Sequence, residues 1–200
     1  MDERELTKDE PTVKQVRSLR VKNRIIVGVA MALASLAVAQ ETRHEITKNS
    51  PGDKKPNSDQ VPGVYAIPTQ FQRVLILRYK FGEDMLGGLE KMVKENKIRN
   101  AVILSGVGSV RNYQVHQVSN RVLPSQNMFV KDPTFPADIT SVNGYIMDGQ
   151  IHAHITLAGP DKAFGGHLEP DTTVFTFAAV TLGVLPDNLD LSKLADKDYR

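Results

Sequence analysis

Three histidines in the C-terminal half of the chain have the types and spacing that could bind a metal ion. His152 and His154 lie two residues apart in a segment that alternates like a β-strand, so both rings should project from the same face. His167 follows Gly165-Gly166, where glycine would allow the backbone to turn back over a sheet. Three neutral imidazoles that converge form a set that binds zinc and leaves one coordination position open. The simpler alternative is a half-solvated strand whose polar face carries two histidines without a metal.

A tight hairpin should position the first two histidines. Asp148-Gly149 separates two alternating segments, 139–147 and 150–157, and this dipeptide is typical of a two-residue hairpin turn. Such a turn fixes the register of the strand that carries the histidines. His167 is predicted to lie in a loop over 159–172.

The remaining pattern predicts an α+β domain with a largely antiparallel sheet and one main amphipathic helix. The helix is expected over 85–96, after a turn at 81–84 that offers a cap. Further strands are expected from apolar or alternating runs, and a polar, proline-containing loop is expected between 119 and 136. These strands cover residues 73–79, 100–107, 113–118 and 174–182.

An enzyme at this site would also need a proton donor or acceptor, and two weak catalytic candidates are present. Glu169 lies two residues after His167, but a loop carboxylate is more commonly solvated. Arg111 could pair with a carboxylate substrate, although a surface arginine is the default interpretation. His116 is expected to face solvent or a subunit contact, and its ring could reach the site from a neighbouring strand.

The N-terminal residues 1–39 read as a signal peptide that directs the protein to the periplasm or outside the cell. A flank with many basic residues precedes the apolar run 25–38, which ends in Ala37-Val38-Ala39. This run is shorter than the roughly 20 apolar residues that span a bilayer. We expect cleavage after Ala39. The alternatives are an uncleaved membrane anchor at residues 25–39 and a true start further downstream.

The rest of the chain divides into a disordered or extended linker at 40–68, a domain at 69–187 and a polar tail at 188–200. The formal net charge is +2, and the excess lies in the N-terminal segment, so the domain lacks a basic footprint for nucleic acid. The absence of cysteine excludes disulfides and thiolate ligands.

The order of the motifs resembles one known family. Phe81-Gly-Glu-Asp84 follows an apolar strand, Gly106-Val-Gly-Ser109 ends another, Asp-Gly-x-x-His-x-His spans 148–154, and Gly-Gly-His-Leu spans 165–168. This arrangement is similar to the plants and prokaryotes conserved (PPC) domain, also called DUF296, whose prokaryotic members are named PD1-like DNA-binding proteins. The resemblance extends over about 69–185.

The resemblance implies an antiparallel α+β fold that assembles as a homotrimer. It also implies similarity in fold and site to α-acetolactate decarboxylase, a zinc enzyme with a comparable ligand arrangement, and hence zinc at His152, His154 and His167. Two features depart from the family: the Arg-Gly-Arg core of an AT-hook is absent, and Ala179 stands where a glutamate is common.

The function expected from the sequence is that of an exported, trimeric zinc-binding protein that binds a small molecule. One alternative is a zinc-dependent lyase or hydrolase that uses the same histidines. The other alternative is DNA binding, which the charge balance, the export signal and the missing AT-hook disfavour.

Overall fold

The computed structural model describes residues 41–45, 62–191 and 194, with the backbone alone for 41–45. The predicted signal peptide at 1–39, most of the predicted linker and most of the polar tail lie outside these residues. The described part folds into one helix and eight strands: β1 (Glu41–Glu45), β2 (Arg73–Lys80), α2 (Met85–Glu95), β3 (Ala101–Val118), β4 (Asn127–Asp132), β5 (Ala137–Met147), β6 (Gln150–Ala158), β7 (Ala163–Leu168) and β8 (Thr173–Val184).

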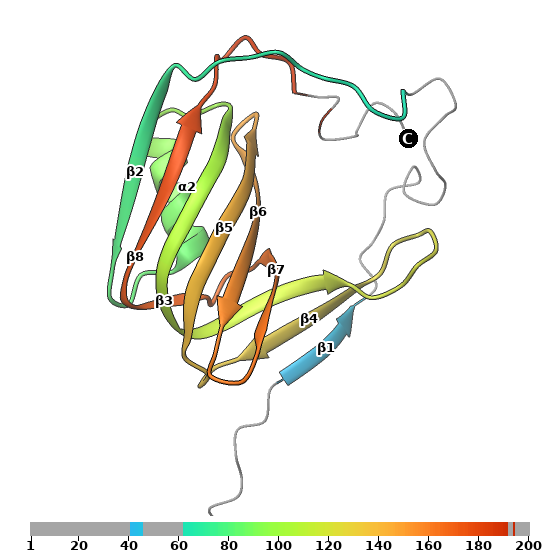
Figure 1. Ribbon diagram of the computed structural model, residues 1–200, viewed down its shortest axis with the longest axis vertical. Coiled ribbons are helices and arrows are strands. Elements are labelled where there is room, and N and C mark those ends of the chain that lie inside the picture. Colours follow the sequence, from blue (N-terminus) through green and yellow to red (C-terminus); the bar gives the residue numbers. More distant parts are fainter. Residues whose placement is uncertain (1–40, 46–61, 192–193, 195–200) are drawn as a thin grey trace, which may run out of the picture. The chain divides into compact units, whose positions relative to one another are not determined.

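The strands form one antiparallel sheet in which β3 is the central element (Figure 1). The N-terminal part of β3 pairs with β5 on one side and β8 on the other, and β8 in turn pairs with β2. Its C-terminal part pairs with β4, which also pairs with β1. The α+β class with a largely antiparallel sheet, predicted from the sequence, is therefore confirmed for the described residues.

Strand β7 closes four of the strands into a ring. It pairs with β6 along most of its length and with the end of β3 through Val115↔Leu168 and His116↔His167. Because β3 also pairs with β5, and β5 with β6, the hydrogen-bonded ladder returns to β3. Closure leaves these strands without the open edges that exposed sheets present.

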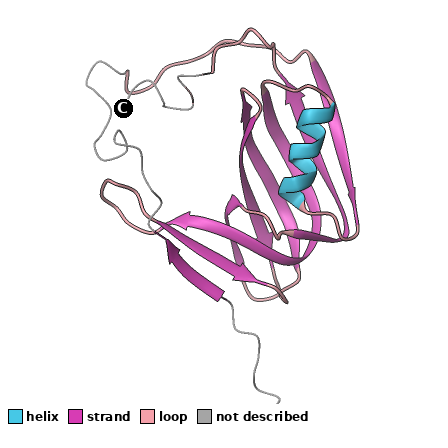
Figure 2. Cartoon of the chain, turned by 180° about the vertical axis from the view of Figure 1, so that it is seen from behind, coloured by secondary structure: helices cyan, strands magenta, loops and turns pink. Residues whose placement is uncertain are grey.

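The helix α2 covers one face of the sheet, as the view from behind shows (Figure 2). Asp84 caps it by accepting a hydrogen bond of 2.8 Å from the backbone N–H of Gly87. Met85, Leu89 and Val93 recur at helical spacing and are buried in the core. Burial of this apolar stripe, rather than local propensity, stabilises a helix of 11 residues.

The hairpin prediction is confirmed, and with it the register of the histidine-bearing strand. Asp148 and Gly149 have φ values of 52° and 76°, the positive pair that a type I′ turn needs. The turn joins β5 to β6 and places Tyr145 opposite His152 and Asn143 opposite His154.

Three predictions of local structure need correction. The strands expected at 100–107 and 113–118 are one strand of 18 residues, β3, because Gly106 is a packing position against Val142 rather than a strand end. The loop expected to 136 contains β4, and the loop expected over 159–172 contains β7. Both strands gain their hydrogen bonds from segments far away in the chain. Residues 41–45, inside the predicted linker, form β1.

The glycine pair before His167 is also not the turn that we predicted. A Cβ at Gly165 would lie 2.1 Å from the carbonyl oxygen of Ile155 on β6, and one at Gly166 would lie 2.4 Å from that of His116 on β3. Neither position has a positive φ. The two glycines therefore serve the close approach of β7 to both neighbours.

We predict that Gly166→Ala destabilises the domain, by about 1–3 kcal/mol, because the backbone that a methyl group would meet has no room to move. Urea unfolding followed by circular dichroism measures the change. Gly63→Ala is the matched control, since no atom lies within 4 Å of a Cβ built there, and its stability should stay within about 0.5 kcal/mol of the unsubstituted protein. Equal stability of the two variants would contradict the packing role of Gly166.

Candidate metal centre

Three of the histidines form a row across neighbouring strands. His154 on β6 lies directly opposite His167 on β7, and His167 lies directly opposite His116 on β3. Side chains at directly opposed positions project from the same face of a sheet. His152 lies two residues before His154 on β6, so it joins the same face.

The alternation of the strands decides which face carries the rings. Ala153 and Ile155 on β6, Leu168 on β7 and Val115 on β3 are buried in the core. The histidines between or beside these residues must therefore point outward. His152 and His154 are exposed, whereas His116 and His167 keep only 20% and 22% of their side-chain surface accessible.

The structure places the three residues that the sequence predicted as metal ligands on one face of the sheet, whereas the described residues whose possible ligand atoms all lie within 4.8 Å of one another are His116, His167 and Glu169. The Nε2 atoms of His152 and His154 are 3.3 Å apart. The ring centroid of His167 lies 5.0 Å from that of His152 and 5.6 Å from that of His154. Two ligands that are 2.0–2.1 Å from a tetrahedral zinc ion are about 3.3–3.4 Å apart, so the first pair already has this separation.

Two further residues belong to the same cluster. Oε1 of Glu169 lies 2.5 Å from Nδ1 of His116 and 3.1 Å from Nδ1 of His167. The Glu169 side chain is only 18% exposed, so it is not the solvated loop carboxylate that we considered simpler. His116, Glu169 and His167 themselves offer donor atoms that lie within 4.8 Å of one another.

The environment favours neutral rings at the exposed pair. Burial, followed by the neighbouring imidazoles, lowers the pKa of both His152 and His154. For Glu169, burial alone would raise the pKa, but hydrogen bonds from His167 and His116 and the charges of these rings bring it below its usual value. At neutral pH the cluster therefore combines unprotonated imidazoles at His152 and His154 with an ionised carboxylate at Glu169.

Packing beneath the row holds β7 in place. The ring of Phe164 on β7 lies 4.6 Å from that of Tyr113 on β3 and 5.8 Å from that of Phe135, measured between centroids. Gln117 donates its side-chain amide to the carbonyl of Gly165. These contacts fix the position from which His167 projects.

The other catalytic candidate, Arg111, lies elsewhere. It is exposed, and its guanidinium carbon is 5.6 Å from the centroid of the Phe81 ring. It precedes His116 by five residues on β3, a separation of about 16 Å at the rise of a strand. The sequence pattern did not predict His116 as a main residue of the site, because its place in the row depends on a pairing between β3 and β7 that no local signal reveals.

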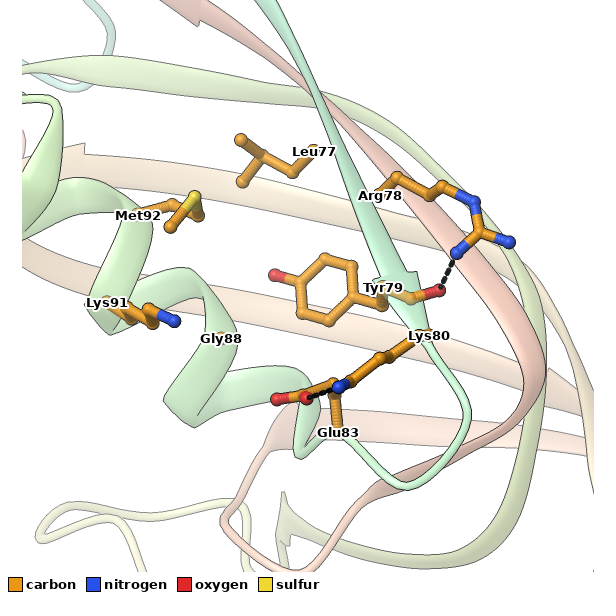
Figure 3. A pocket seen from close by; sticks show the side chains of 8 residues that line it. All are labelled: Leu77, Arg78, Tyr79, Lys80, Glu83, Gly88, Lys91 and Met92. Atoms are coloured by element: carbon orange, nitrogen blue, oxygen red, sulfur yellow. Dashed lines mark hydrogen bonds and ion pairs between the residues drawn. The ribbon is translucent and has the colours of Figure 1, made fainter.

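A hollow lies between β2 and α2 (Figure 3), with a volume of about 380 Å³. Leu77 and Met92 form apolar walls, and Lys80 pairs with Glu83 at 3.7 Å. The hydroxyl of Tyr79 is buried without a hydrogen-bond partner, and burial raises its pKa. A Cβ at Gly88 would lie 2.2 Å from the Tyr79 ring, so the helix packs closely here. None of the residues predicted to do chemistry lies in this hollow.

The fold and the site define the class of this protein as an antiparallel α+β domain that carries a histidine cluster on one face of its sheet. The chain belongs to the Plants and Prokaryotes Conserved (PCC) domain family, whose model matches residues 67–186. The family resemblance stated from the motifs is thereby confirmed. Similarity to α-acetolactate decarboxylase stays a prediction.

Two sequence relatives are cyanobacterial proteins named bifunctional protein GlmU. The one from Synechococcus sp. strain JA-3-3Ab is 26% identical over 137 residues, which are 68% of this chain and 20% of that protein. The one from strain JA-2-3B'a(2-13) is 23% identical over 125 residues, or 60% and 18% of the two chains. This chain thus spans about a fifth of the length of these relatives.

Solved structures share the fold at low sequence identity. A protein of Salmonella cholerae-suis superposes with a TM-score of 0.53 at 24% identity, over 61% of this chain and 83% of that one. A metal-containing protein of Archaeoglobus fulgidus gives a TM-score of 0.50 at 22% identity, over 60% and 86%. A PPC protein of Pyrococcus horikoshii gives 0.50 at 23% identity, over 64% and 85%.

Proposed function

We propose that this PCC-domain protein binds one zinc ion per chain through His152, His154 and His167 and uses the remaining coordination position to bind a small molecule. The observation that carries the proposal is the 3.3 Å separation of the Nε2 atoms of His152 and His154, with the His167 ring centroid within 5.6 Å of both rings. The description of the Archaeoglobus relative as metal-containing supports it.

The donor set suits this metal. Zinc takes neutral imidazole nitrogen, and the lowered pKa values of His152 and His154 keep these rings unprotonated near neutral pH. With three protein ligands, zinc would supply an open Lewis-acid position for water, a carboxylate or a carbonyl. The exposure of the first two histidines leaves that position accessible from solvent.

The two other functions considered from the sequence, a zinc-dependent enzyme and a DNA-binding protein, have less support. A zinc-dependent lyase or hydrolase would occupy the same site, but Glu169 already bonds two imidazoles and Arg111 contacts Phe81 instead. DNA binding needs a positive surface, and a formal net charge of +2 over 200 residues does not favour it. Binding of a small molecule at the metal therefore remains our proposal.

We predict near-stoichiometric zinc in the purified protein and its loss in His154→Ala, measured by elemental analysis and by competition with a chromophoric chelator. Removal of a ligand should weaken binding by more than the roughly 100-fold that outer residues contribute. Gln150→Ala is the control, because Gln150 is exposed on the same face of β6. Equal zinc affinity of His154→Ala and the control would contradict the site.

The same titration has a predicted pH dependence. Protons compete with zinc for imidazole, so affinity falls as the pH decreases. Since the pKa of His152 and that of His154 are lowered, we expect protons to displace zinc from these two ligands at a lower pH than from unperturbed histidines. Binding that weakened from pH 7.5 downward would contradict this arrangement.

We also propose that the chain assembles as a homotrimer through the sheet face opposite α2. Alternate residues of β2 and β8 leave large apolar side chains exposed there, with Ile76 at 75% and Phe177 at 46%. Val74, Val107 and Phe175 extend this face across three strands. An exposed apolar surface of this kind is typical of a protein contact.

Light scattering should report three times the mass of the purified chain, and Ile76→Glu should lower it to that of a monomer without loss of the circular dichroism spectrum. Val64→Glu, at a residue 92% exposed ahead of β2, is the control and should remain trimeric. A monomeric mass for the unsubstituted protein at micromolar concentration would exclude this assembly.

The proposed location outside the cytoplasm depends on the sequence of residues 1–39, which lie outside the described residues. No helix in the described part is long and apolar enough to cross a membrane. N-terminal sequencing of exported protein should begin at Gln40. A product that begins at Met1 would favour the anchor instead.

A further inference from the structure

We propose that Glu169 is a positioning residue that fixes the orientation and tautomer of His167, and that His116 holds Glu169 in place for this task. The part that concerns metal affinity rests on the proposed zinc site. The part that concerns the tautomer is independent of any metal. Neither role follows from the spacing of the three predicted ligands.

The hydrogen-bond geometry determines which nitrogen of His167 can bind a metal. Oε1 of Glu169 lies 3.1 Å from Nδ1 of His167, and an ionised carboxylate can only accept hydrogen bonds. Nδ1 must therefore carry the hydrogen that it donates. In a neutral ring this leaves the lone pair on Nε2, which becomes the donor atom for a cation.

The same carboxylate oxygen is held from a second side. Nδ1 of His116 lies 2.5 Å from Oε1 and donates to it, so Glu169 bridges a residue of β3 and a residue of β7. Because Glu169 follows the end of β7, this bond ties the strand end to its neighbour and keeps the carboxylate beside His167.

Ring packing indicates that His116 supports the site rather than contributing a ligand. Its ring stacks on that of His167 with centroids 4.4 Å apart and an interplanar angle of 18°. On β4, Phe129 lies opposite His116, with ring centroids 5.0 Å apart. Nδ1 of both stacked rings points at the same carboxylate oxygen, so Nδ1 of His116 is engaged by Glu169 rather than by the proposed ion. His116 therefore limits the rotation of His167.

Carboxylate–histidine pairs of this kind orient metal ligands in many proteins and contribute roughly 10–100-fold to affinity. Here one oxygen serves two histidines, so loss of the carboxylate would release both rings. Loss of His116 would leave the bond between Glu169 and His167 but remove its second anchor. The effect of His116→Phe, which keeps an aromatic ring in the stack, should therefore be smaller than that of Glu169→Ala.

The first experiment uses the metal-free full chain with ¹⁵N-labelled histidine and long-range ¹H–¹⁵N spectra at pH 7.5. We expect the His167 ring to be protonated at Nδ1 and unprotonated at Nε2. Glu169→Ala should lose this single tautomer, whereas Glu169→Gln should keep it, because the amide oxygen still accepts a hydrogen bond. Protonation at Nε2 in the unsubstituted protein, or an unchanged tautomer in Glu169→Ala, would overturn the proposal.

The second experiment measures zinc affinity by chelator competition, with circular dichroism to confirm that each variant is folded. Glu169→Ala should bind about 10–100-fold more weakly than the unsubstituted protein, and Glu169→Gln should recover part of the loss. Asp171→Asn is the control: it removes an exposed carboxylate two residues away, and asparagine tolerates the φ of 69° at that position. Equal affinity of Glu169→Ala and Asp171→Asn would overturn the positioning role.

The two experiments separate this inference from the proposed function. A protein that binds no zinc but shows the expected His167 tautomer, lost in Glu169→Ala, would refute the zinc site and support the role of Glu169 in fixing the ring. A protein that binds zinc through the three histidines with no change in Glu169→Ala would support the site and refute the role of Glu169.

Discussion

The close approach of β7 to both β6 and β3 is the constraint on which the histidine cluster depends. At Gly165 and Gly166 the backbone carbonyls of the neighbouring strands lie where a side chain would begin. Only hydrogen fits in that space, so the two glycines allow one short strand to join two ladders. Once β7 is paired on both sides, the register of the ladders brings His154, His167 and His116 into one row.

The row also explains the electrostatics of the cluster. Burial, and after it the repulsion between protonated imidazoles at close range, lowers the pKa of both His152 and His154. The carboxylate of Glu169 lies on the side where the two less exposed rings meet, and hydrogen bonds from both keep it ionised. The arrangement brings the Nε2 atoms of His152 and His154 to 3.3 Å from each other, and this is the pair that we propose binds a cation.

Local signals predicted those elements whose stability is local. The helix has a cap at Asp84 and a buried stripe, and the hairpin has the residues that its turn requires, so both were found at their true positions. The strands β4 and β7 were not found, because each has only six residues and their hydrogen bonds come from distant segments. The same non-local pairing explains why His116 was undervalued and why Glu169 was considered solvated.

By itself, the sequence determined the family and the antiparallel α+β class, and it predicted a set of three histidines that would bind one metal ion. Alternation along one strand and a type I′ turn suffice for His152 and His154, because both rules act over a few residues. The tertiary structure decided that His167 lies on a strand, that His116 stacks on it and that Glu169 bonds both rings. Those relations arise from the pairing of β7 with β3, whose partners lie about 50 residues apart in the chain, a separation at which residue patterns no longer specify which strands meet.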